Sequence, residues 1–311
     1  MSASAVIEVE SVARSFGDVH AVRDASFTVN AGSVTALIGP NGSGKTTLML
    51  MLATLLRPDS GTIRIAGHDP VSDPRAVRSA MGWMPDVLGS WGTISVRRTL
   101  EITGRLYERT QTQSRERAQQ LIELVGLDEL AEQPTRVLSR GQKQRLSLAR
   151  ALVHEPSVLL LDEPASGLDP AARVELRTLV RRLASEGVAV LVSSHVLAEL
   201  DEMADSAVYL ERGVTASDER IEASRAQSRD WRIRAVDPAA LAAALKKLRI
   251  AASPPDHLGT AVSVAGEAEA AQLLAKLVGA GVAISAFGPA VGDFEHTFLD
   301  LSRTTTEGGP R

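Results

Sequence analysis

The sequence of 311 residues contains no cysteine. Disulfide bonds and thiolate metal sites are therefore excluded, and the absence fits a reducing compartment. We expect the protein to function in the cytoplasm.

The sequence also lacks any sustained basic run, and its formal net charge is −4. Proteins that bind nucleic acid through the phosphate backbone need a basic surface. No nucleic-acid partner is expected, and any phosphate group must be bound at a local site.

The sequence also predicts neither a secretion signal nor a membrane-spanning segment. The N-terminus, MSASAVIEVE, has acidic residues where a signal needs a basic start and an apolar core. The longest weakly charged stretch, Ala271 to Gly292, has the length of a membrane span but holds Lys276, four glycines and Pro289. It is predicted to form a helix, a turn and a strand.

Length and composition indicate two folded domains. The chain is about twice as long as a typical domain. Hydrophobic residues make up 44% and charged residues 23% of it, which is ordinary for globular proteins and argues against disorder. One large and one smaller domain are predicted.

Three continuous apolar runs predict strands that are buried on both faces of a parallel sheet. These runs are 34–38, 158–161 and 188–193. Functional residues are then expected where the strands end. Apolar residues at helical spacing, within 115–125 and 142–154, predict a helical subdomain inserted over about 87–155.

The composition changes after Gly213, which we take as the end of the large domain. Residues 214–230 are polar and charged and are interpreted as a linker or an exposed helix. Alternating short elements then predict a small α+β domain over 231–303, followed by a tail at 304–311. The expected strands are 231–236, 260–265 and 282–287, and the expected helices are 239–248, 268–278 and 294–301.

A glycine-rich segment follows the first apolar run and precedes a helical run, 47–56. Its residues match the phosphate-binding P-loop pattern and are Gly39, Pro40, Asn41, Gly42, Ser43, Gly44, Lys45 and Thr46. Backbone N–H groups in such a loop cradle phosphate oxygens, Lys45 reaches the β- and γ-phosphates, and Thr46 can ligate Mg²⁺. The alternative is a glycine turn that contains a lysine by chance.

The second apolar run ends in two adjacent carboxylates, Asp162 and Glu163. This is the form of a Walker B element, in which Asp162 holds Mg²⁺ and Glu163 accepts a proton from the attacking water. An acidic pair that merely ends a strand is the alternative. The P-loop upstream favours the catalytic interpretation.

The segment Leu138-Ser139-Arg140-Gly141-Gln142 is similar to the signature LSGGQ of ABC proteins and lies just before the Walker B run. The chain therefore resembles the ATP-binding subunits of ABC transporters. That resemblance implies a P-loop NTPase core with a parallel sheet, an N-terminal antiparallel β subdomain and an inserted helical subdomain. The segment alone could also be a simple helix cap.

Further elements of the family occur in the same order and spacing. The resemblance implies that Phe16 stacks on adenine, that Asp169 couples the two sites of a dimer, and that His195 contacts the γ-phosphate and orients Glu163. Phe16 could instead be a core residue, and a lone histidine is often structural. The residues implied in nucleotide binding are Phe16, residues 39–46, Thr47, Ser139, Gly141, Gln142 and Asp169; those implied in catalysis are Lys45, Glu163 and His195; those implied in metal binding are Thr46, Asp86 and Asp162.

Two positions depart from the family pattern. Asp86 stands where the Q-loop has glutamine, and a carboxylate is still a good ligand for Mg²⁺. Arg140 replaces the first glycine of the signature and puts a bulky cation there, with an effect that the sequence does not predict.

Three segments, namely 138–145 with the form LSRGQ-x-QR, Met84-Pro85-Asp86 and the terminal 294–301, most resemble the ATPase subunits of ABC-2 type exporters of drugs, antibiotics and polysaccharides. The resemblance implies ATP and Mg²⁺ as ligands, a second copy of the chain or a homologous ATPase as partner, and a separately encoded membrane permease. The permease is expected near Val87–Arg97, where Leu88, Trp91 and Ile94 are apolar. The chain would lie on the cytoplasmic face of the membrane. The alternatives are an importer ATPase and a soluble ABC ATPase outside transport.

Overall fold

The structure is a computed structural model that describes residues 5–87, 89, 92–225 and 227–307. The chain divides into two compact units, Met1–Thr215 and Ala216–Arg311. Each unit has its own hydrophobic core.

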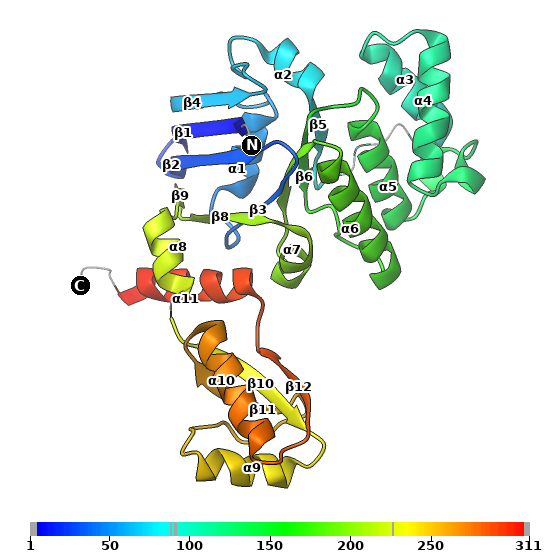
Figure 1. The fold of residues 1–311 in the computed structure, drawn as a ribbon. Coiled ribbons are helices and arrows are strands. Elements are labelled where there is room, and N and C mark those ends of the chain that lie inside the picture. The colour runs from blue at the N-terminus through cyan, green and yellow to red at the C-terminus, as the bar shows by residue number, and fades with distance from the viewer. Residues whose placement is uncertain (1–4, 88, 90–91, 226, 308–311) are drawn as a thin grey trace. The chain divides into compact units, whose positions relative to one another are not determined.

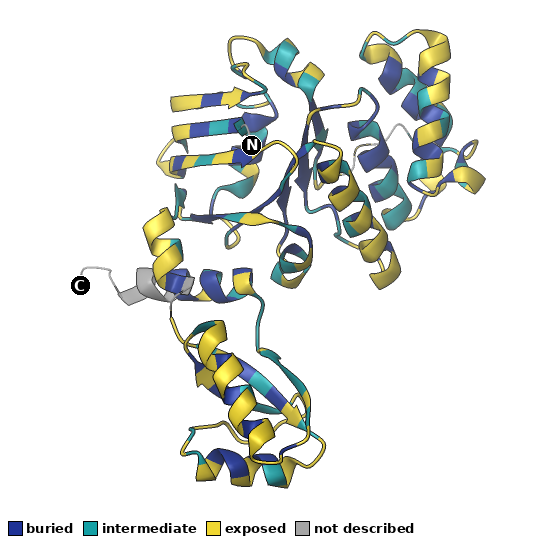
Figure 2. Ribbon diagram, viewed as in Figure 1, coloured by how far each residue is buried: buried dark blue, intermediate teal, exposed yellow. Residues whose placement is uncertain are grey.

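The first unit is built on a sheet in the order β4-β1-β2-β9-β8-β3-β7-β6-β5 (Figure 1). Within it β8, β3, β7, β6 and β5 run parallel to one another. Every residue of β3, β6 and β7 is buried (Figure 2), as expected for strands covered on both faces. The parallel strands are β3 (Val34–Ile38), β5 (Met81–Met84), β6 (Val158–Asp162), β7 (Ala189–Ser193) and β8 (Ser206–Glu211).

The other side of this sheet is antiparallel except where β2 pairs with β9 in parallel. Strand β1 pairs with both β2 and β4, and β9 pairs antiparallel with β8. The strands are β1 (Ala5–Phe16), β2 (Val19–Asn30), β4 (Ser60–Ile65) and β9 (Val214–Thr215). The α/β core with an antiparallel β subdomain is thereby confirmed.

Helices surround the parallel strands, and α3, α4 and α5 supply the predicted helical subdomain (Figure 1). Leu37, Leu48, Met51, Leu160 and Leu191 belong to one buried cluster that joins α1 to the strands. The helices are α1 (Lys45–Leu52), α2 (Pro74–Ala80), α3 (Val96–Leu106), α4 (Gln111–Leu124), α5 (Arg140–Ala151), α6 (Pro170–Ser185) and α7 (Leu197–Met203), with short 3₁₀ turns η1 (Asp128–Leu130) and η2 (Thr135–Val137).

The second unit is a three-stranded antiparallel sheet, in the order β11-β10-β12, with helices packed on it. Its core contains Trp231, Ile233, Leu241, Leu273 and Leu277. The elements are α8 (Asp218–Arg225), β10 (Arg229–Ala235), α9 (Pro238–Lys247), β11 (Thr260–Val264), α10 (Gly266–Gly279), β12 (Ile284–Pro289) and α11 (Asp293–Glu307).

Three predicted boundaries are wrong. Helix α1 ends at Leu52 and not at residue 56, because Thr54 turns into the left-handed region with φ 63°. The segment 214–230 is not a plain linker: it holds β9, α8 and the start of β10, so the alternative of an exposed helix is the correct one over 218–225. Helix α11 continues to Glu307, through part of the proposed tail. Among the described residues no helix has both the length and the apolarity to cross a membrane.

Candidate nucleotide site

The parallel strands bring the predicted site residues to one edge of the sheet. Ser193 of β7 lies opposite both Leu37 of β3 and Asp162 of β6, and Leu161 lies opposite Met84 of β5. The P-loop, Glu163, His195 and Asp86 directly follow these strands. Because parallel strands end at the same edge, segments separated by up to about 150 residues meet there.

The P-loop adopts a conformation that only glycine allows at its key positions. Gly42 and Gly44 have φ of 79° and 105°, in the left-handed region that disfavours other residues. A Cβ on Gly39 would lie 2.3 Å from the Leu210 carbonyl oxygen, and one on Gly44 would lie 2.3 Å from that of Ala21. The glycines therefore allow the backbone to wrap closely.

Two groups in the loop fit a bound phosphate. The Ser43 hydroxyl is buried and has no hydrogen-bond partner among the described residues. The Lys45 ammonium donates to the carbonyl oxygens of Gly39, at 2.6 Å, and Pro40, at 3.2 Å. Burial lowers the pKa of Lys45, while the negative charges of Glu163 and Asp162 act in the opposite direction. Phosphate oxygens would accept from both groups at the amino end of α1.

Asp162 is 6% exposed and accepts a 2.6 Å hydrogen bond from the Ser193 hydroxyl. Burial raises the pKa of Asp162 and the Ser193 hydrogen bond lowers it, whereas the charges of Glu163 and Asp86 raise it further. A cation beside Asp162 would relieve the repulsion between its charge and those of Glu163 and Asp86. These carboxylates are not close enough together to enclose a metal by themselves, since no group of three or more acidic, histidine or cysteine side chains in the described chain could do so. This donor set fits Mg²⁺, which takes one or two carboxylates together with substrate phosphates.

The side chains of Glu163 and His195 contact each other directly. The His195 Nδ1 and a Glu163 carboxylate oxygen lie 2.7 Å apart, and the His195 backbone N–H donates to the same oxygen. Glu163 has φ 52°. Its backbone carbonyl oxygen accepts a hydrogen bond of 3.0 Å from the side-chain amide of the buried Gln144. Its side chain is 18% exposed, so the carboxylate is fixed in place but open to water.

Phe16 does not belong to the core, because 48% of it is exposed. The Arg14 guanidinium lies 4.9 Å from its ring centroid. The core alternative for this residue is therefore wrong, and an aromatic ring is available at the surface.

The signature residues form a helix cap in this chain. Ser139 caps α5, its hydroxyl accepting from the backbone N–H of Gln142, and the Gln142 side chain accepts from the Ser139 N–H. Asp169 caps α6 in the same way, through the N–H of Ala172 at 2.9 Å. Within the described chain no hydrogen bond or ion pair joins Ser139, Gly141, Gln142 or Asp169 to the P-loop. These residues are not brought to the site of their own chain.

Comparison with known proteins places the chain in a family. The pattern of the ABC transporter family matches residues 22–166. The daunorubicin resistance ATP-binding protein DrrA3 of Streptomyces coeruleorubidus is 38% identical over 211 residues, which are 68% of this chain and 67% of that protein. The chain belongs to the ABC transporter family. It is an ATP-binding subunit of that family and an ATPase.

Other relatives agree with this assignment. The Nod factor export ATP-binding protein I of Burkholderia lata is 38% identical over 67% of this chain and 69% of its own length. A solved ATP-binding subunit of an ABC transporter superposes with a TM-score of 0.65 and 26% identity, over 70% of this chain and 92% of that one. The matched range 22–166 lies within the first unit and includes the P-loop, the signature segment, Asp162 and Glu163.

Three residues of this ABC ATPase unit that support the site were not predicted. Ser193 bonds Asp162, Gln144 bonds the Glu163 backbone, and Ser166 bonds Arg140. A polar residue at the end of a buried strand was a usable signal for Ser193. Gln144 and Ser166 act through contacts between distant segments, which spacing along the sequence does not indicate.

Proposed function

We propose that this chain hydrolyses ATP with Glu163 as the proton acceptor, and that this reaction powers export through a separately encoded membrane subunit. The observation that carries the proposal is the carboxylate of Glu163, beside Asp162 at the strand edge and held 2.7 Å from the His195 Nδ1. Relatives named for drug resistance and for Nod factor export support the direction of transport.

In the proposed binding mode the exposed ring of Phe16 stacks on adenine. Residues 39–46 and Thr47 bind the phosphates, with Lys45 on the β- and γ-phosphates. Thr46, Asp162 and Asp86 would hold Mg²⁺, directly or through water. Bound Mg²⁺ would neutralise the charge on the transferred phosphoryl group.

In the proposed reaction Glu163 takes a proton from the attacking water. His195 fixes the carboxylate through two hydrogen bonds, one from its backbone and one from its ring, and it would contact the γ-phosphate from its exposed position. Lys45 stabilises negative charge electrostatically.

The proposed active unit is a dimer. Ser139, Gly141 and Gln142 would bind the γ-phosphate held by the second chain, and Asp169 would couple the two sites. The amino end of α5 supports this arrangement, because its backbone N–H groups and dipole favour an anion. A solved cassette of the same fold, at 23% identity, is a dimer with ADP and phosphate bound.

The test is the substitution Glu163→Gln, which keeps the size of the side chain and removes its basicity. ATP binding should remain, while turnover should fall by roughly two to four orders of magnitude. Arg57→Ala, at an exposed position, is the control and should hydrolyse ATP at the normal rate. Near-normal turnover by Glu163→Gln would refute the assignment.

The proposed docking site for the membrane subunit is a cavity of about 430 Å³ beside the helical subdomain. Val87 and Leu106 line it and are 82% and 70% exposed, and Leu55 is 63% exposed. Exposed apolar residues gathered in this way are typical of a protein interface. Of the residues predicted for this contact, Leu88 and Trp91 lie outside the described residues. In this proposal the chain is peripheral, on the cytoplasmic face of the membrane.

Export and docking can be tested by purifying the tagged full chain from native membranes. An integral membrane protein should copurify with it, and Leu106→Glu should lose that partner while retaining ATP turnover. If the membrane protein still copurifies with Leu106→Glu, the partner binds elsewhere on the chain.

A further inference from the structure

Arg140 replaces a glycine of the family signature, and its side chain folds back onto its own chain. Its Nη2 donates to the Ser166 hydroxyl at 2.8 Å. Its Cδ and Nε lie 2.7 Å from the position that a Cβ on Gly167 would occupy. The guanidinium therefore packs against the segment Ser166–Asp169, which we call the D-loop.

We propose that Arg140 is a positioning residue that locks the signature end of α5 to the D-loop of the same chain. The inference rests on the proposed function, in which the signature serves the nucleotide of the second chain. Arg140 would then fix the orientation of the trans-acting Ser139 relative to the D-loop and Glu163.

The shape of the D-loop fits this contact. Gly167 has φ of 76°, so it adopts a conformation that disfavours side chains, and the missing Cβ leaves the room that the Arg140 side chain fills. Gly141, the next residue of the signature, is also close, because a Cβ there would lie 3.3 Å from the Leu168 side chain. Both glycines thus allow α5 and the D-loop to approach.

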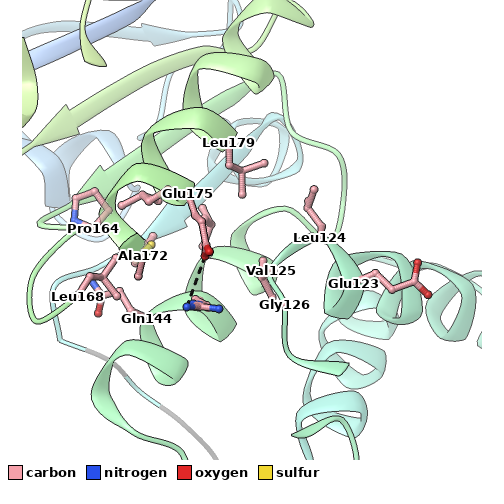
Figure 3. Close-up of a pocket in the computed structure, with 14 residues that line it drawn as sticks. Glu123, Leu124, Val125, Gly126, Gln144, Pro164, Leu168, Ala172, Glu175 and Leu179 are labelled. Carbon is pink, nitrogen blue, oxygen red and sulfur yellow. Dashed lines mark ion pairs between the residues drawn. The ribbon is translucent and has the colours of Figure 1, made fainter. Parts of the chain in front are cut away.

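Helix α5 also contacts the segments next to the D-loop. A cavity of about 280 Å³ lies beside it, lined among others by Gln144, Pro164 and Leu168 (Figure 3). Polar contacts join α5 to the residues on either side of the D-loop. Gln144 bonds the Glu163 carbonyl at 3.0 Å, and Arg145 lies 3.6 Å from Glu175 of α6, the ion pair drawn in Figure 3.

Arg140 and Gln144 are four residues apart and share one face of α5. Through Gln144 the helix holds the backbone of Glu163, and through Arg140 it holds the D-loop three to four residues further on. A tilt of the amino end of α5 therefore moves the signature and the catalytic segment together. Without the Arg140 side chain, the amino end of α5, which carries the signature, loses its hydrogen bond to the D-loop.

The alternative role for Arg140 is a direct contact with the phosphates bound by the second chain. A double-mutant cycle on the full chain separates the two roles, because coupled residues are non-additive. The variants are Arg140→Ala, Ser166→Ala and the double substitution, each assayed for kcat and KM of ATP hydrolysis.

If Arg140 positions the signature, Arg140→Ala should lower kcat about fivefold to tenfold, the effect of losing one charge-assisted hydrogen bond. KM should change less than about twofold, and the double variant should be no slower than Arg140→Ala. Arg140→Lys should restore part of the rate only while Ser166 is present. The proposal would be overturned in favour of a direct phosphate contact by either of two results. One is a double variant whose loss in kcat is the product of the two single losses, and the other is a raised KM with unchanged kcat in Arg140→Ala. Unchanged kcat and KM in Arg140→Ala would overturn it as well.

Arg140 and Ser166 lie on the surface or close to it, so the variants should fold, and thermal melting of each is the check. Arg57→Ala removes another exposed guanidinium and should keep the wild-type kcat. The proposed function fails separately, through normal turnover by Glu163→Gln. If Glu163→Gln turns over slowly but the effects of Arg140→Ala and Ser166→Ala on the activation free energy are additive, the positioning role of Arg140 is refuted and the proposed function stands.

Discussion

His154 should make the stability of the first unit depend on pH. Its ring stacks on that of Tyr107, with the centroids 3.8 Å apart and the planes 4° apart. Its Nε2 lies 3.0 Å from the Met81 carbonyl oxygen. Burial lowers the pKa of His154 to about 4, the Met81 hydrogen bond opposes this, and the charges of Arg109 and Arg117 lower it further.

The sign and size of the effect follow from linkage. The unfolded chain takes up the proton near the ordinary pKa of 6.5, whereas the folded chain takes it up only near 4. The stabilisation is therefore fully present above pH 6.5 and is lost as the pH falls toward 4. Each pH unit within this window is worth at most about 1.36 kcal/mol. Between pH 7.5 and pH 5 the free energy of unfolding should fall by about 2 kcal/mol.

Urea unfolding followed by circular dichroism measures this change, and pH 5 keeps ordinary carboxylates ionised. His154→Phe keeps an aromatic ring on Tyr107 and removes the titrating group. It should be less stable at pH 7.5, because it lacks the bond to Met81, but should lose the 2 kcal/mol dependence. His257→Phe, at an exposed position, should keep it. Equal pH dependence in wild type and His154→Phe would refute the reasoning.

Three further outcomes follow from the geometry. Gly44→Ala should weaken binding of a fluorescent ATP analogue at least roughly tenfold, through strain and the clash with the Ala21 carbonyl. Gly187→Ala is its control, because that glycine has φ 102° but open space around it. Ser193→Ala should raise the Mg²⁺ concentration for half-maximal turnover roughly tenfold, since Asp162 loses its partner. Leu277→Ala should destabilise the second unit by about 2–5 kcal/mol in calorimetry, with ATP turnover unchanged.

Patterns confined to short segments predicted much of the fold. The run 34–38 matches β3 residue for residue, because a strand buried on both faces must be apolar throughout. The P-loop was predictable because its glycines and lysine are consecutive. Strand ends placed Asp162 and His195 correctly, since parallel strands finish at one edge.

Contacts between segments that are distant in the sequence could not be predicted from such patterns. Nothing in the spacing of Arg140 and Ser166 indicates that their side chains meet, 26 residues apart. The polar segment after Gly213 was open between a linker and an exposed helix, because charged residues suit both, and the structure forms the helix α8 there. Sequence alone also left Phe16 open between core and surface, and its 48% exposure settles only that question. Its role in binding adenine stays a prediction.

The most direct test of the shared ATP site is the solution mass of Glu163→Gln with ATP and Mg²⁺. If each nucleotide is held between the P-loop of one chain and the signature of the other, this variant should have twice the mass of one chain with ATP, and the mass of one chain with ADP. A variant that binds ATP fully and keeps the mass of one chain at every protein concentration would contradict the account.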